Sequence, residues 1–155
     1  MNLQDIIKNI EPLDQDWITK AEDRTAKLVM PTRALGRLHD ISERLCAIQK
    51  TMQPSLNRKA ILVMAGDHGV VDECVSAYPQ EVTGAMVQTF LVGGAGINAI
   101  ARHIEADVFV VDMGIKAELN GTDSNGLIVH KIAPGTANFT RGPAMSRRDA
   151  EQSVL

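Results

Sequence analysis

The chain contains an uninterrupted apolar run, AILVMAG at residues 60–66, that ends at two ionisable side chains, Asp67 and His68. A run this short and this rich in Ile and Val predicts a strand that is covered on both faces, as in a parallel sheet with helices above and below. Ligands bind at the carboxyl ends of the strands in open α/β sheets. Asp67 and His68 are therefore expected at the rim of a site.

A second apolar run, VFVVDMG at residues 108–114, also ends with a carboxylate beside a glycine, and this carboxylate is Asp112. The residues between the two runs have helical periodicity, with Val82, Met86, Val87 and Phe90 as a predicted buried stripe. The pattern predicts a parallel strand–helix–strand crossover, with Pro79 in the opening turn of the helix and Glu81 in its first turn. A third strand is predicted at residues 127–132, after a polar excursion at 116–125.

The first 55 residues have helical periodicity, with a break at Pro12 and a second helix that is expected to end at Pro31. A third amphipathic helix is predicted from apolar residues at three- and four-residue spacing, namely Leu35, Leu38, Ile41, Leu45 and Ile48. The linker-like composition of residues 52–57 places a boundary there. We expect a helical region at 1–55 and the first part of an α/β domain at 56–155, with its sheet incomplete at Leu155.

The composition excludes several classes of protein. Sixteen Lys and Arg against nineteen Asp and Glu give a formal charge of −3, which provides no basic field for nucleic acid or an anionic membrane. The uninterrupted apolar runs are too short to cross a bilayer, and Asp5 and Glu11 stand where a secretory signal would be basic and then apolar. Cys46 and Cys74 have no metal-binding or disulfide spacing. A cytoplasmic protein is expected.

The GDHG turn at residues 66–69 has two other interpretations. Asp67, His68 and Asp112 could belong to a metal-dependent hydrolase, but the remaining candidate ligands, His103 and His130, are expected inside a helix and a strand. We therefore expect no metal site. The simpler interpretation is that Asp67 accepts backbone hydrogen bonds in a tight turn.

A tyrosine and a proline lie beside the predicted rim, in VSAYPQEVT at residues 75–83. Tyr78 could simply close the loop against the core. Alternatively, a phenol ring beside Pro79 and Met86 would form a slot for a flat ring, because these side chains offer rigid or adaptable apolar surfaces. The glycines of GGAGIN at 93–98 follow a helix rather than a strand, so close helix packing or a helix break explains them better than a dinucleotide fingerprint.

Five motifs in register resemble the nicotinate-nucleotide:dimethylbenzimidazole phosphoribosyltransferase family of cobalamin biosynthesis. They are AGDHGVV at 65–71, VSAYPQEVT at 75–83, GGAGIN at 93–98, VDMGI at 111–115 and GTANFTRGPAMSR at 135–147. The resemblance covers most of the chain but only the amino-terminal part of the family. It implies a Rossmann-like parallel sheet with flanking helices, a small helical domain formed partly by the amino-terminal helices, and a homodimer.

The resemblance also implies a reaction. A 5-phosphoribosyl group would move from nicotinate mononucleotide to 5,6-dimethylbenzimidazole or a related base, giving α-ribazole 5′-phosphate and nicotinate. Such chemistry needs a carboxylate to accept the N–H proton of the attacking base, an apolar slot for that base, and backbone donors for the phosphate. It needs no metal or other cofactor, and its partners are small molecules.

By the same resemblance, the acceptor slot corresponds to Tyr78, Pro79, Thr83 and Met86. Some family members carry a small hydroxyl residue at the position of Tyr78 and an amide at that of Met86. The glutamate base of the family would lie beyond Leu155, so no catalytic residue is assigned. The competing hypothesis is a non-catalytic binding or assembly module that keeps the acceptor pocket.

Overall fold

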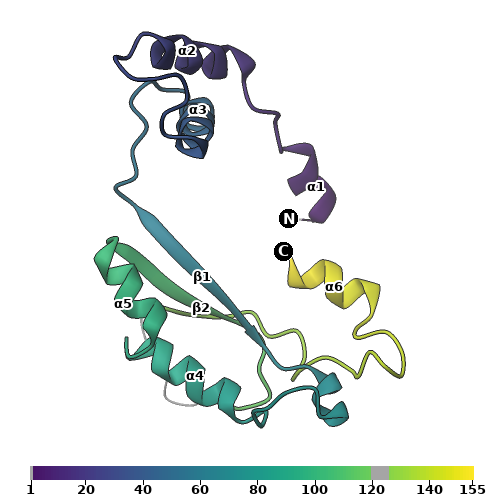
Figure 1. The fold of residues 1–155 in the computed structure, drawn as a ribbon. Helices are drawn as coiled ribbons and strands as arrows, with labels where there is room; N and C mark the ends of the chain where they lie inside the picture. Colours follow the sequence, from purple (N-terminus) through teal and green to yellow (C-terminus); the bar gives the residue numbers. More distant parts are fainter. Residues whose placement is uncertain (1, 120–125) are drawn as a thin grey trace. The chain divides into compact units, whose positions relative to one another are not determined.

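The computed structural model describes residues 2–119 and 126–155 (Figure 1). Its elements are α1 (Leu3–Lys8), α2 (Gln15–Ala26), α3 (Arg37–Gln49), β1 (Lys59–Gly66), the 3-10 helix η1 (Gly69–Glu73), α4 (Val82–Leu91), α5 (Gly96–His103), β2 (Ala106–Gly114), β3 (Leu127–Val129) and α6 (Arg147–Ser153). The chain divides into a helical unit, Gln4–Asn57, and an α/β unit that contains Arg58–Leu155.

In the helical unit, α2 begins after Asp14, whose side chain accepts the backbone N–H of Asp16 at 2.9 Å. This bond satisfies one of the free donors at the start of the helix. The helix ends at Ala26, before the predicted end at Pro31, and the N–H of Lys27 turns back to the carbonyl of Arg24 at 3.1 Å. The proline therefore lies in the following turn and is not what ends the helix.

Helix α3 packs against α2 through a face that its sequence pattern does not predict. The expected apolar stripe is largely exposed: Leu38 is 59%, Ile41 51% and Ile48 62% exposed. The buried residues of α3 are His39, Glu43, Cys46 and Ala47, and that of α2 is Ala21. Small side chains let two helices approach closely, which explains why the alanines and the cysteine are buried instead of the larger apolar residues.

The α/β unit contains a parallel sheet in the order β1-β2-β3, which confirms the predicted fold class. The third strand ends at Val129, three residues before its predicted end at Ile132. His130 still donates its N–H to the carbonyl of Asp112 at 2.9 Å, but the N–H of Ile132 reaches the carbonyl of Met113 only at 3.5 Å. The ladder opens here because β2 itself ends, at Gly114.

One face of the sheet carries the core. Val110 of β2 packs with Val87 of α4 and with Ile115, and both α4 and α5 lie along this side in Figure 1. Side chains alternate between the faces of a strand, so Leu62 and Met64 lie on the other face, where they are 54% and 61% exposed. Coverage of β1 on both faces was expected, but among the described residues α4 and α5 cover only one.

By length and composition alone, Val82–His103 would be apolar enough to cross a membrane. In the structure this segment is two helices, α4 and α5, which pack on the sheet and bury Val87 and Ala101. Gly93, with φ +77°, lies at the junction, and the Asn98 amide donates to the carbonyl of Phe90 at 3.0 Å. The GGAGIN motif is therefore a helix break, which is one of the two explanations that the sequence left open.

The entry to α4 differs from the prediction by about one turn. Val82 donates its N–H to the carbonyl of Pro79 at 3.2 Å, so the chain begins to turn at the proline. The α-helix proper begins at Val82, and Glu81 is the residue that precedes it rather than a member of its first turn. This turn brings residues 78–80 against the carboxyl end of β1, where they line a cavity.

Candidate functional site

The GDHG turn after β1 is hydrogen-bonded to the end of β2 and to the segment that follows β3. Asp67 donates its N–H to the carbonyl of Gly114 at 3.0 Å, and its own carbonyl accepts the N–H of Thr136 at 3.0 Å. Gly69 donates to the carbonyl of Thr136, and a Cβ at Gly69 would lie 2.6 Å from the backbone nitrogen of Asn138. Only glycine fits this crossing without displacing the backbone. The turn is therefore fixed in place beside the 136–138 segment.

The two buried carboxylates of the rim hold turns. Asp67 is 5% exposed, and its Oδ2 accepts the N–H of Lys116 at 2.8 Å. Asp112 is 2% exposed, and its Oδ1 accepts the N–H groups of Gly114 at 3.0 Å and Ile115 at 2.8 Å. Its Oδ2 lies 3.4 Å from Nζ of Lys131. These bonds agree with the simpler interpretation of Asp67, and they give Asp112 the same kind of role.

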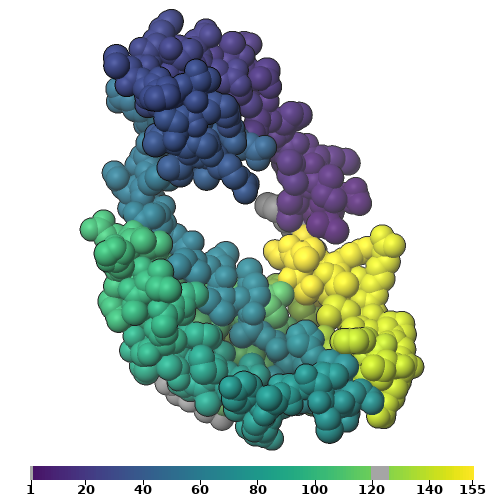
Figure 2. All heavy atoms as spheres, viewed as in Figure 1, coloured from purple at the N-terminus to yellow at the C-terminus, as the bar shows by residue number. Residues whose placement is uncertain are grey.

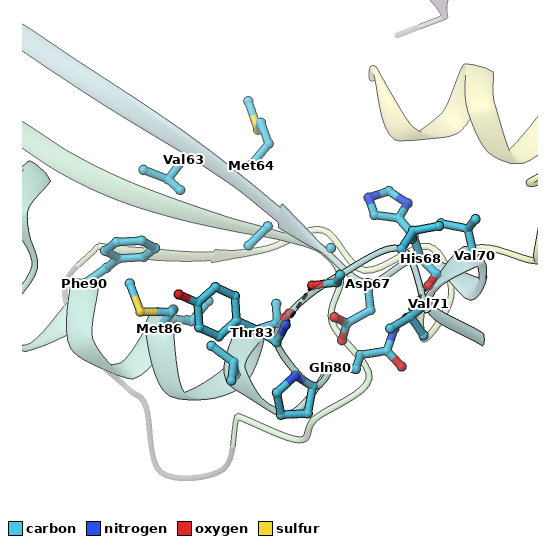
Figure 3. Close-up of a pocket in the computed structure, with 18 residues that line it drawn as sticks. Val63, Met64, Asp67, His68, Val70, Val71, Gln80, Thr83, Met86 and Phe90 are labelled. Atoms are coloured by element: carbon cyan, nitrogen blue, oxygen red, sulfur yellow. Dashed lines mark hydrogen bonds between the residues drawn. The ribbon is translucent and has the colours of Figure 1, made fainter. Parts of the chain in front are cut away.

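A cavity of about 510 Å³, which we call the α4 cavity, lies beside the end of β1. Its walls come from β1, η1, the 75–80 loop and one side of α4. All four residues of the predicted acceptor slot line it: Tyr78, Pro79, Thr83 and Met86. Asp67 and His68 line it as well, whereas Asp112 does not. Figure 3 shows Thr83, Met86 and Phe90 along the helix and Asp67 near the turn.

The lining of the α4 cavity is mostly apolar. Met86 is 40% exposed and Val82 36%, although both were expected in the buried stripe of α4. They face the cavity, whereas Val87, which is 1% exposed, also packs against the sheet. Tyr78 is 72% exposed, so its ring is available to a ligand. A ring and a flexible thioether on an apolar wall suit a flat, uncharged molecule.

The imidazole of His68 is turned away from the α4 side of the turn, as Figure 3 shows. Its Nδ1 lies 3.4 Å from the hydroxyl of Thr136, and its backbone carbonyl accepts the amide of Gln80 at 3.3 Å. The Gln80 side chain therefore ties the loop before α4 to the GDHG turn. His68 and Asp67 line both the α4 cavity and a second cavity beside α6.

A polar cluster joins η1 to the segment that follows β3. The carboxylate of Glu73 accepts hydrogen bonds from Asn138 Nδ2 at 2.7 Å, Arg141 Nη2 at 3.1 Å and Thr140 Oγ1 at 3.2 Å. These bonds hold the pKa of Glu73 below its usual range, and the bond from Asn138 has the largest effect. Figure 2 shows the teal η1 region in contact with the yellow-green segment around residue 140.

No group of three or more His, Cys, Asp or Glu that could hold a metal ion is found in residues 2–119 and 126–155. His103 is the last residue of α5, and His130 directly follows β3, where its Nε2 lies 3.2 Å from the carbonyl of Gln152. Cys46 is buried in the helical unit, Cys74 is exposed, and both are free thiols. The described side chains therefore offer no cluster for metal-assisted hydrolysis.

Sequence reasoning missed several lining residues and the second segment of the rim. Val70, Val71 and Gln80 line the α4 cavity but carry no chemical signature of their own. Thr136 and Asn138 lie beside the turn because parallel strands end at the same edge of a sheet. The GTANFTR motif after the third strand could have indicated this position.

These features define a class of protein: an α/β protein with a mainly apolar cavity at the carboxyl end of its first parallel strand. A sequence model of the family described as "Phosphoribosyltransferase" matches residues 10–155. The chain belongs to this phosphoribosyltransferase family.

Two relatives make the comparison more specific. The chain is similar to the nicotinate-nucleotide–dimethylbenzimidazole phosphoribosyltransferase of Geotalea uraniireducens, with 47% identity over 152 residues, 98% of this chain and 43% of the relative. It is equally similar, at 47% over 143 residues, to the enzyme of that name from Thermus thermophilus, of which it covers 42%.

The crystal structure of the enzyme from Thermus thermophilus superposes with a TM-score of 0.83, over 90% of this chain and 42% of that chain. The chain thus spans less than half the length of these relatives.

Proposed function

We propose that the chain forms the acceptor-side wall of a phosphoribosyltransferase site. The acceptor is 5,6-dimethylbenzimidazole or a related flat base, and the donor is nicotinate mononucleotide. The products are α-ribazole 5′-phosphate and nicotinate. The observation that carries this proposal is the α4 cavity, which gathers Tyr78, Pro79, Thr83 and Met86 in one wall.

The size and lining of the α4 cavity support a flat organic acceptor. Its volume of about 510 Å³ lies within the range of small-molecule sites, roughly 300–1,000 Å³. Asp67 is the one carboxylate in its described lining, and that side chain is already held by the N–H of Lys116. A neutral bicyclic ring therefore fits this wall better than an anion.

The reaction needs more than this wall. The attacking ring nitrogen forms a bond to C1′ of the ribose while the bond to nicotinate breaks, and the N–H proton of the base must pass to a proton acceptor. The resemblance assigns that role to a glutamate beyond the matched region. We therefore assign binding and orientation of the base to this chain, and the proton transfer to a group outside it.

Replacement of Tyr78 tests the acceptor slot. We expect Tyr78→Ala to weaken binding of 5,6-dimethylbenzimidazole about tenfold or more, because an aromatic wall contributes on the order of 1 kcal/mol beyond its buried area. Calorimetric titration of the chain with the base measures this change. Phe139→Ala is the matched control, since Phe139 is also an exposed ring, 59% exposed, but does not line the cavity. Equal losses in the two variants would refute the slot assignment.

A second candidate function is a binding or assembly module that keeps the pocket without catalysis. Incubation with nicotinate mononucleotide and 5,6-dimethylbenzimidazole separates the two. The enzyme proposal expects release of nicotinate when the unmatched carboxyl-terminal part of the Geotalea relative is added, and none from that part alone. If the chain forms a complex with the added carboxyl-terminal part and nicotinate is still not released, the binding or assembly module is favoured.

We also propose that the protein acts in the cytoplasm as a homodimer on small-molecule substrates. The two free thiols support the cytoplasmic location, and the formal charge of −3 provides no basic field for nucleic acid or an anionic membrane. The family resemblance supports the homodimer. Sedimentation analysis of the purified chain measures the association state.

A further inference from the structure

The helical unit has a cavity of its own, of about 350 Å³, which we call the α2–α3 cavity. Its walls come from α2, from the segment that joins α2 to α3, and from α3. Two carboxylates line it, Glu22 of α2 and Glu43 of α3, together with the apolar side chains of Met30 and Pro31. The proposed function makes no use of this cavity.

The carboxylate of Glu43 is buried without a partner. The residue is only 9% exposed, and it lines the cavity from α3. No hydrogen bond or ion pair from the described residues reaches this carboxylate. Buried charges in proteins are normally paired and hydrogen-bonded, because an uncompensated buried charge is strongly unfavourable. The cavity in front of Glu43 therefore calls for a ligand that supplies the missing partner.

The other polar groups near Glu43 do not neutralise it. Arg33 forms an ion pair with Asp40, which does not line the cavity. The hydrogen bond to Asp40 is the main reason that the pKa of Arg33 is raised, and the attraction of Glu43 adds to it at longer range. His39 is 5% exposed, and its Nε2 accepts the N–H of Leu35 at 3.2 Å. That nitrogen carries no proton, so the ring is not an imidazolium.

The lining of the α2–α3 cavity favours an organic cation. No group of three or more His, Cys, Asp or Glu that could hold a metal ion is found in the described parts of the chain. A guanidinium group is planar, weakly hydrated and able to donate two parallel hydrogen bonds to one carboxylate. Such a group suits a buried carboxylate beside Met30 and Pro31 better than a strongly hydrated ammonium does.

We propose that the α2–α3 cavity binds a guanidinium group, with Glu43 as its main partner and Glu22 as a second. Two sources share this chemistry: a small guanidinium compound and the side chain of an arginine in another polypeptide segment. The site lies within the helical unit, so it stands or falls independently of the acceptor slot in the α/β unit.

The test uses N-methylguanidinium chloride, with the neutral planar analogue N-methylurea as the comparison. Amide chemical shifts of the 155-residue chain are followed by NMR at constant ionic strength. We expect saturable shifts at the residues that line the cavity, with a dissociation constant on the order of 1 mM, and no such shifts with N-methylurea. Shifts that do not saturate, or equal shifts with the two compounds, would overturn the proposal.

Variants of the acidic residues test the partners. Glu43→Gln should weaken binding about tenfold or more, because the charge-assisted hydrogen bonds are lost. Glu22→Gln should weaken it about threefold, since this carboxylate is exposed, and it tests the site even if Glu43→Gln does not fold. Asp23→Asn is the matched control: Asp23 is an exposed acidic residue of α2 that does not line the cavity, and its replacement should keep the affinity within about twofold. Equal affinities of Glu43→Gln and the parent chain would refute the assignment.

The melting temperature gives a second readout, which needs no ligand. Glu43→Gln removes a buried charge that has no partner, so the free chain should melt about 2 °C or more above the parent chain. N-methylguanidinium should raise the melting temperature of the parent chain but not that of the variant. If the variant melts below the parent chain without ligand, Glu43 already has a stabilising role within the fold, and the proposed site is overturned.

A competition experiment distinguishes the two sources of the guanidinium group. The unmatched carboxyl-terminal part of the Geotalea relative is added to the chain, and N-methylguanidinium is titrated into the complex. If the complex no longer binds the probe and Glu43→Gln weakens the complex, an arginine side chain of that part is the natural occupant. If the complex still binds the probe, the occupant is a small molecule. Either result supports the site.

Discussion

At the scale of single residues, the rim of the site depends on backbone geometry as much as on chemistry. Asp67 and Asp112 are ionisable, yet between them their carboxylates accept three backbone N–H groups of neighbouring turns. Gly69 allows the first of these turns to cross the 136–138 segment. The GDHG motif therefore acts first as a scaffold, which brings His68 and the loop before α4 to the cavity walls.

The close contact at Gly69 predicts a large effect of one added methyl group. Gly69→Ala should destabilise the chain by about 1–3 kcal/mol, because overpacking against backbone atoms cannot be relieved by a side-chain rotation. Denaturant unfolding measures the change.

Gly96→Ala is the matched control for Gly69→Ala. A Cβ at Gly96, the first residue of α5, meets no atom within 4 Å. This variant should be neutral or more stable by up to about 1 kcal/mol, since alanine has the higher helix propensity. Equal stability of the two variants would contradict the tight crossing.

At the scale of elements, the Glu73 cluster connects η1 to the segment after β3. Because the pKa of Glu73 is lowered in the folded chain, the cluster stabilises the fold above the ordinary pKa of 4.5. This contribution is lost as the pH falls through the lowered pKa. Glu73→Gln should therefore lower the melting temperature near neutral pH, and its difference from the parent chain should shrink steadily in acid.

The control for Glu73→Gln is Asp72→Asn, which removes a neighbouring exposed carboxyl of η1. Melting curves of the three chains at a series of pH values give the comparison. A difference between Glu73→Gln and the parent chain that is independent of pH would show that the charge of Glu73 does not hold the two segments together.

The elements also show what the sequence could predict. The apolar runs placed β1 and β2 correctly, because short runs rich in Ile and Val favour strands, even though one face of β1 is largely exposed. The periodicity of α3 was misleading, since Leu38 and Ile41 are exposed while Cys46 and Ala47 are buried. Periodicity identifies an apolar face but not the partner of that face. Here the close approach of α2 and α3 buries the small residues instead.

The candidate site could be predicted only in part. Tyr78 and Met86 could be placed near β1 because a crossover helix must begin at the carboxyl edge of the sheet. The 3-10 helix η1 and the individual bonds between Thr136 and the GDHG turn could not be predicted, although the GTANFTR motif after the third strand could have placed Thr136 near the rim. The contacts of the 136–138 segment depend on bonds between segments that are more than sixty residues apart. The 3-10 helix is a local turn without a distinctive sequence.

At the scale of the whole molecule, the chain covers 43% of the Geotalea relative, and one face of its sheet leaves Leu62 and Met64 exposed. All the lining residues of the α4 cavity lie in the α/β unit. The central claim, binding of a flat base in this cavity, can therefore be tested on the chain as it is.

The most direct test is a measurement of nuclear Overhauser effects between bound 5,6-dimethylbenzimidazole and a chain with isotope-labelled methionine and threonine methyl groups. The methyl protons of the base should show contacts with the methyl groups of Thr83 and Met86, and Met86→Leu identifies the methionine signal. Contacts with Met52 or Met145, which lie outside the α4 cavity, and none with Thr83 or Met86 would contradict the account.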